Sequence, residues 1–172
     1  METRPFKTAN NPFGGARPEV SLEKRVSDLE DVAALNRMIT AYTSYCDPYN
    51  AEGFASLFAE DGVWESGHYG VKTGRDEIRD FIAGIDSEII WACHHITNSD
   101  VQISEDGQSA IGIWYLLVME DFREEDGSVS GYLATADYHN TFVKKDGTWY
   151  LQHCNPQTKS ETKMPTTWRK HD

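Results

Sequence analysis

Three Asp-Gly pairs in the second half of the 172-residue chain constrain its fold more than any other feature, because they recur every 20 residues. They are Asp106-Gly107, Asp126-Gly127 and Asp146-Gly147. Asp-Gly favours the tight turn of a β-hairpin, where glycine readily adopts a positive φ. The segments around these turns are rich in aromatic and β-branched residues and occupy 109–122, 131–144 and 148–154. This pattern predicts long antiparallel strands that follow one another as a meander.

The first half of the chain shows helical periodicity instead. From about Ser27, apolar residues recur at helical spacing as far as Cys46, which predicts one long helix. Pro48 disfavours helical geometry at the residue before it, so the helix should end at Asp47. An acid at this position faces the negative end of the helix dipole, which is unfavourable. The placement of Asp47 therefore suggests a purpose other than helix stability.

Three shorter elements are expected between the long helix and the meander. The pattern predicts a short helix over 50–60, a short strand over 63–65, a turn over 67–71 and a third helix over 74–84. Helices grouped before a long antiparallel sheet indicate an α+β fold. We expect the sheet to curl over the helices and enclose one apolar core.

Composition limits the classes of function. Hydrophobic residues make up 39% of the chain, which suits one ordinary domain. The formal charge of -12, without a clustered basic stretch, argues against a nucleic-acid partner, since phosphate binding depends on Lys and Arg. No apolar run is long enough for a membrane span, and the first residues lack the apolar middle of a secretory signal, so we expect a cytoplasmic protein with no membrane partner. Three cysteines without a CxxC pair indicate neither a disulfide framework nor a metal site.

The chain is expected to divide into three parts. Residues 1–26 should form a flexible arm, because most of this segment is polar, contains Pro and Gly and shows no periodicity. Residues 27–155 carry the periodic patterns and should form the α+β domain. Residues 156–172 are polar apart from Trp168, and we expect a lid or a disordered tail there.

Two adjacent histidines lie in the stretch WACHHITN, which otherwise suits a buried strand. Because successive side chains of a strand point to opposite faces, only one of His94 and His95 can face the interior. A buried imidazole needs hydrogen-bond partners, and a nearby carboxylate can make it a proton acceptor. His94 is thus either a core histidine whose nitrogens are satisfied or a catalytic base, and His95 is expected at the outer surface of the sheet.

Four stretches taken together resemble one family. Tyr42 and Asp47 are separated by four residues, LFAEDGVW occupies 57–64, the helix start GRDEI occupies 74–78, and HHITN occupies 94–98. In this order they resemble the landmarks of the SnoaL-like, scytalone dehydratase-like branch of the nuclear-transport-factor-like superfamily. Members of this branch include bile acid dehydratase, hexachlorocyclohexane dehydrochlorinase and polyketide cyclases.

The resemblance covers about residues 27–155 and implies both a fold and a chemistry. The implied fold is a cone-shaped α+β barrel, with N-terminal helices packed in a strongly curved, mostly antiparallel sheet. The family pattern makes His94 the base, Asp47 its orienting carboxylate and Tyr42 a polarising donor, with no cofactor and no metal. The implied assembly is a homo-oligomer, with a trimer favoured and a dimer as the alternative.

The function expected from this pattern is a cofactor-independent lyase or isomerase, with a dehydratase favoured, that acts on a small hydrophobic polycyclic or aromatic substrate. The alternatives are a polyketide cyclase that uses the same dyad and a non-catalytic protein that binds a small hydrophobic ligand. Aromatic and polar side chains are expected to bind the substrate. These are Trp64, Asn98, Trp114, Tyr115, Tyr132 and Tyr138.

Some features depart from the family or stay open. The strand after HHITN shows no acid or imidazole among its central residues, and the charged run 120–126 is interpreted as a solvated hairpin end. Asp137 and His139 share one face of the strand 131–142. If that face lines the cavity, they are rival catalytic groups; a polar subunit interface is the favoured alternative. No basic patch is present to meet the phosphates of coenzyme A.

Overall fold

The computed structural model describes residues 19–169. Residues 1–18 of the expected arm and residues 170–172 of the expected tail lie outside this range. The helices are α1 (Leu22–Cys46), α2 (Ala51–Ser56), α3 (Gly74–Gly84) and the 3-10 turn η1 (Ile85–Ser87). The strands are β1 (Phe58–Ser66), β2 (Gly70–Thr73), β3 (Ile89–Ile103), β4 (Ser109–Arg123), β5 (Val129–Lys145) and β6 (Thr148–Lys163).

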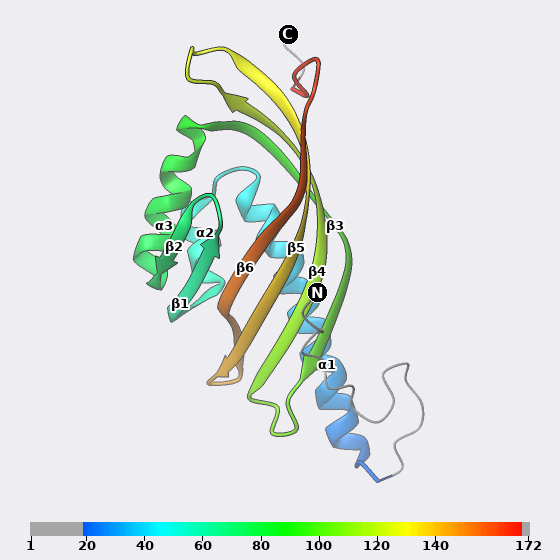
Figure 1. Ribbon diagram of the computed structural model, residues 1–172. Coiled ribbons are helices and arrows are strands. Elements are labelled where there is room, and N and C mark those ends of the chain that lie inside the picture. The colour runs from blue at the N-terminus through cyan, green and yellow to red at the C-terminus, as the bar shows by residue number, and fades with distance from the viewer. Residues whose placement is uncertain (1–18, 170–172) are drawn as a thin grey trace.

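The strands form one sheet in the order β2-β1-β6-β5-β4-β3. All neighbouring strands are antiparallel except β1 and β6, which run parallel. The α1 helix crosses behind the long strands, and α2 and α3 lie beside β1 and β2 (Figure 1). The α+β fold and the meander predicted from the Asp-Gly turns are therefore confirmed. Strands β2 and β3 are the edges of the sheet, and the cone shape and strong curvature stay predictions.

Helix α1 packs an apolar face into the core of the protein. The Ser21 side chain accepts a hydrogen bond from the Lys24 backbone N–H at 3.2 Å, which caps the start of the helix. The helix thus begins five residues before the predicted Ser27. Its buried face includes Leu35, Ile39 and Tyr42, one or two turns apart. The helix ends with Asp47 as its C-cap, as the following proline predicted.

Sheet pairing overrides the local pattern at three places. The second helix ends at Ser56 rather than near residue 60, because Phe58 begins a strand that pairs with Leu151 of β6. Strand β6 continues to Lys163, although we expected a lid or disordered tail from residue 156. The 17-residue strand β5 offers backbone partners along this whole length, so a polar segment without a clear pattern still completes the sheet. Residues 70 and 71, expected in a turn over 67–71, belong instead to strand β2, which pairs with β1.

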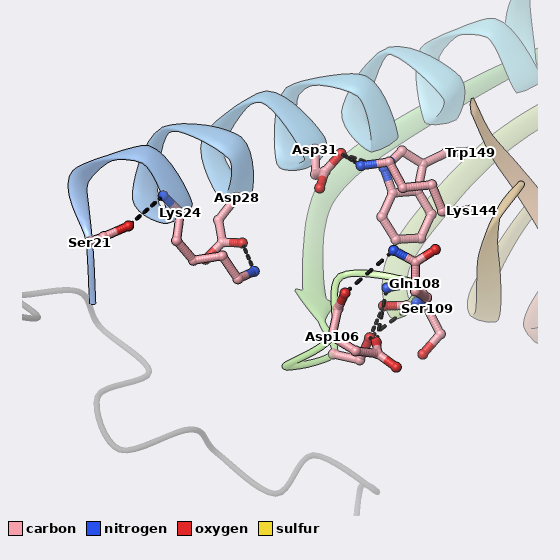
Figure 2. Close-up of polar contacts among 10 residues, drawn as sticks. Ser21, Lys24, Asp28, Asp31, Asp106, Gln108, Ser109, Lys144 and Trp149 are labelled. Atoms are coloured by element: carbon pink, nitrogen blue, oxygen red, sulfur yellow. Dashed lines mark hydrogen bonds and ion pairs between the residues drawn. The ribbon is translucent and has the colours of Figure 1, made fainter. Parts of the chain in front are cut away.

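A buried carboxylate connects α1 to the end of the sheet at which β5 turns into β6 (Figure 2). Asp31 accepts hydrogen bonds from Lys144 Nζ at 2.7 Å and from Trp149 Nε1 at 2.8 Å. Burial alone would raise the pKa of Asp31, but these two donors outweigh it and hold the pKa below its ordinary value. The interaction joins the first turns of α1 to β5 and β6.

Candidate active site

A cavity of about 1020 Å³ lies against the inner face of β4 and β5. Its floor and walls are mainly apolar and include Leu116, Val118, Ala134, Ala136 and Tyr138. These residues alternate along their strands, as expected for one face of a sheet. A space of this size accommodates a small polycyclic molecule.

The same alternation settles which face of β5 meets the cavity. Tyr132 and Tyr138 line it. Asp137 and His139 have the opposite parity and therefore point to the outer face. There the Asp137 carboxylate forms an ion pair with Lys159 at 3.3 Å. Asp137 and His139 are thus not rival catalytic groups in this cavity.

His94 and Asp47 form a close hydrogen-bonded pair at the cavity. The Nδ1 atom of His94 lies 2.6 Å from Oδ1 of Asp47. The backbone N–H of His94 lies 3.2 Å from each carboxylate oxygen. Because a carboxylate only accepts, Nδ1 must carry the proton in this pair. The neutral ring then keeps Nε2 without a proton, as a general base requires.

The end of α1 explains the unfavourable position of Asp47. The Asp47 backbone N–H donates to the Thr43 carbonyl at 3.0 Å, which fixes the residue as the last helical position. Its carboxylate is held against the dipole by the two donors of His94. The His94 side chain is only 10% exposed and lines the cavity, whereas His95 on the opposite face is exposed.

Tyr42 lies on the cavity floor, one turn before the end of α1. Its hydroxyl accepts a hydrogen bond from Trp64 Nε1 at 3.0 Å. Burial raises the pKa of Tyr42 well above its ordinary value, so the hydroxyl keeps its proton and can donate. The ring is fixed by an edge-on contact with Tyr138. The arrangement suits a preorganised donor to a polar atom of a bound molecule.

The other residues predicted to bind substrate are divided between the cavity and the rest of the fold. Trp64, Tyr132 and Tyr138 line the cavity. Trp114, Tyr115 and Asn98 do not belong to its lining.

Trp114, Tyr115 and Asn98 lie outside the cavity lining for three different structural reasons. Trp114 is 1% exposed and stacks on Tyr138 with ring centroids 5.2 Å apart, so it supports the cavity wall from the core. Tyr115 has the opposite parity along β4 and faces outward. Asn98 is exposed, because the pairing of β3 shifts register between Ile96 and Asn98.

Glu120 is a cavity residue that the sequence analysis missed. We interpreted it as part of a solvated charged run, but it is 9% exposed and lines the cavity. It pairs with Ala92 of β3, next to the pair formed by His94 and Val118, so its side chain lies diagonally from His94 on the same face. No residue between 19 and 169 donates a hydrogen bond to its carboxyl group. The signal was present in the sequence, since Glu120 has the same parity along β4 as the inward-facing residues before it.

Burial raises the pKa of Glu120, a positive charge on His94, when that ring is protonated, lowers it, and Glu161 adds to the rise. A carboxyl group whose pKa is raised by folding contributes stability at low pH and loses it as the pH rises through the folded-state value. We therefore expect Glu120→Gln to increase the free energy of unfolding at pH 8. The increase should disappear below pH 4.5, the ordinary value for this group. Urea unfolding at both pH values measures this, and an equal effect at both would contradict it.

In the part of the chain from 19 to 169, no three His, Cys, Asp or Glu side chains converge in a way that could hold a metal ion. None of the helices in that part has the length and apolar character needed to cross a bilayer.

The fold defines an α+β protein of the cystatin-like fold class. The model of the SnoaL-like domain family matches residues 27–155. The chain therefore belongs to the SnoaL-like family. A search of curated proteins by sequence gave no match.

Solved structures agree with this assignment at the level of the fold. Hexachlorocyclohexane dehydrochlorinase LinA type 2 is 18% identical with a TM-score of 0.78, over 85% of this chain and 97% of that one. A candidate scytalone dehydratase from Novosphingobium aromaticivorans is 22% identical with a TM-score of 0.71, over 86% of this chain and 99% of that one. An NTF2-like protein with a cystatin-like fold from the same organism is 20% identical with a TM-score of 0.63, over 79% and 86%.

Proposed function

We propose that the protein is a cofactor-independent lyase, specifically a dehydratase, that removes a proton from a carbon atom of a hydrophobic ring substrate. The observation that carries the proposal is the His94–Asp47 pair, joined at 2.6 Å, at an apolar cavity of about 1020 Å³. Dehydrochlorinase and dehydratase are also the activities named for two proteins of similar structure.

The proton transfer begins at His94. Its Nδ1–H donates to Asp47, which fixes the ring and stabilises the imidazolium that forms. Nε2 takes the proton from carbon, and the electron pair of the broken C–H bond stays on the substrate, with its charge delocalised onto a substrate oxygen, until the C–O bond breaks and the pair becomes the new C=C bond. Such a positioned base contributes about a hundred to ten-thousand fold in rate. Tyr42 donates a hydrogen bond to the oxygen on which negative charge develops.

The leaving hydroxyl needs a proton, and Glu120 is the group placed to supply it. Because burial raises its pKa, the carboxyl group holds its proton at a higher pH than an ordinary glutamic acid. Glu120 then protonates the hydroxyl, the C–O bond breaks and water leaves. His94 finally returns its proton to Glu120, directly or through solvent, which restores both groups. A base and an acid on adjacent strands thus serve the two halves of one elimination.

Incubation with a panel of hydroxylated polycyclic compounds tests this function. Loss of water creates a conjugated double bond, so we expect a new ultraviolet absorption and a product lighter by one water molecule. A cyclase would yield a product with an added ring instead. Compounds that bind, as measured by calorimetry, and are recovered unchanged would contradict the proposed enzyme and support the ligand-binding alternative.

A further inference from the structure

The charged residues of the cavity wall are nearly all acidic. Five glutamates and one arginine belong to the lining: Glu88, Glu120, Glu124, Glu125, Glu161 and Arg123. Glu88 directly precedes β3, Glu120 and Arg123 belong to the last part of β4, Glu124 and Glu125 follow it, and Glu161 lies in the last part of β6. Among residues 19–169, the lining histidines are His94 and His68, which lies beside Glu88.

Some of this charge is compensated and some is not. Glu124 forms an ion pair with Lys163 at 2.6 Å, and Arg123 donates from Nε to the Ser87 carbonyl at 3.3 Å. Glu88 accepts a hydrogen bond from the Tyr69 hydroxyl at 3.0 Å. Glu161 has no ion-pair partner within residues 19–169. The wall thus keeps an excess of negative charge.

Glu120 gives a second and independent indication of the ligand. More than nine tenths of this residue is buried, it lines the cavity, and no donor within residues 19–169 satisfies its carboxyl group. Neither of its carboxyl oxygens is among the fully enclosed side-chain atoms that lack a partner, so they open to the cavity and can pair with a bound molecule. A hydroxyl group suits either protonation state of Glu120, since it accepts from the acid and donates to the carboxylate, and an ammonium group pairs with the carboxylate. A bound carboxylate or phosphate is instead repelled by the ionised form of Glu120.

We propose that this cavity selects its ligand by charge. It takes uncharged or cationic ring compounds that present a hydroxyl or ammonium group to Glu120. It excludes compounds that carry a carboxylate, a sulfate or a phosphate, which includes thioesters of phosphate-bearing carriers. Glu88, which is half-buried, and Glu161, which is exposed, act against anions at longer range, most strongly at low ionic strength. This selectivity specifies the substrate class of the site, and the catalytic role of the site rests on the proposed function.

Three matched probes test the selection without any need for turnover. They are 2-naphthalenemethanol, 2-naphthylmethylammonium and 2-naphthoate, which share one ring system and differ in charge. Calorimetric titration at low ionic strength gives the dissociation constants. We expect 2-naphthoate to bind at least about tenfold more weakly than the alcohol, and the ammonium compound to bind at least as tightly as the alcohol. Added salt should narrow both differences.

A double variant, Glu88→Gln with Glu161→Gln, tests whether the acidic side chains of the cavity cause the weaker binding of 2-naphthoate. We expect it to reduce the discrimination against 2-naphthoate severalfold. Glu105→Gln and Glu23→Gln together remove the same charge at exposed positions outside the cavity lining and should leave the discrimination unchanged.

Equal binding of 2-naphthoate and the alcohol would overturn the inference, as would an unchanged preference in the double variant or failure of all three probes to bind. Because only binding is measured, an inactive dyad would defeat the proposed function and leave this selection intact.

Discussion

His94→Ala is expected to lower kcat/KM by about a hundred to ten-thousand fold, the range of a positioned general base. The variant removes the atom that accepts the proton and leaves the Asp47 carboxylate with only the backbone donor of residue 94. Steady-state kinetics on the compound that the panel identifies measures the loss. Circular dichroism and ligand titration should show a folded protein that still binds the compound.

His95→Ala is the matched control, because His95 is adjacent in sequence but exposed on the other face of β3. It should keep the wild-type kcat/KM. Equal losses in the two variants would mean that the strand is disturbed and that His94 has no special role.

A double-mutant cycle tests whether Asp47 acts through His94. Asp47→Asn should lower the rate, since an amide neither stabilises the imidazolium nor fixes the tautomer. In the His94→Ala background the same change should have almost no further effect on kcat/KM, because groups that act as one unit are not additive. Additive losses would contradict the dyad and indicate separate roles.

Asp31→Ala is expected to lower the free energy of unfolding by about 3 kcal/mol, the lower end of the range for removing one partner of a buried ion pair. The change leaves the Lys144 ammonium and the Trp149 indole N–H without the carboxylate that both contact. It also releases α1 from β5 and β6 at the end of the sheet shown in Figure 2. Equilibrium urea unfolding at pH 7 measures the difference.

The lowered pKa of Asp31 also predicts how the stability difference between wild type and Asp31→Ala changes with pH. Folding lowers the pKa of Asp31, so its contribution is present above the unfolded-state value, near 3.8, and is lost as the pH falls through the folded-state value. The difference between wild type and Asp31→Ala should therefore shrink in that acid range. Glu30→Ala, one residue earlier and exposed, should change little. If Glu30→Ala lowered the free energy of unfolding equally, the loss would come from a general weakening of helix α1 and not from the contacts of Asp31.

Local chemistry in the sequence was sufficient for much of the fold. The turn at Asp146-Gly147 has a positive φ at both residues, as an Asp-Gly hairpin requires, and it sets the register of β5 against β6. Pro48 determined where α1 ends and hence where Asp47 lies. The contact of Asp47 with His94 spans 47 residues of sequence. No local rule predicts such a contact, and the family resemblance supplied it.

The missed features have one cause, which is that tertiary burial does not follow local polarity. The run from Glu120 to Asp126 is continuously charged apart from Phe122, yet the alternation of β4 turns Glu120 inward. The end of β6 is equally polar, and its strand is fixed only by the length of β5. Asn98 follows the expected parity from His94, but the register shift before it removes it from the cavity. For the end of β6 and for Asn98, a partner strand, absent from the local pattern, decides the outcome.

The most direct test of the account is exchange of a carbon-bound hydrogen with heavy water. The wild-type protein is incubated in heavy water with uncharged hydroxylated ring compounds, and mass spectrometry and proton NMR follow the deuterium in recovered substrate and in product. We predict incorporation at one carbon position that disappears in His94→Ala and persists in His95→Ala. No exchange and no loss of water with a compound that binds in the cavity, or equal exchange in His94→Ala, would contradict the claim that His94 removes a proton from carbon.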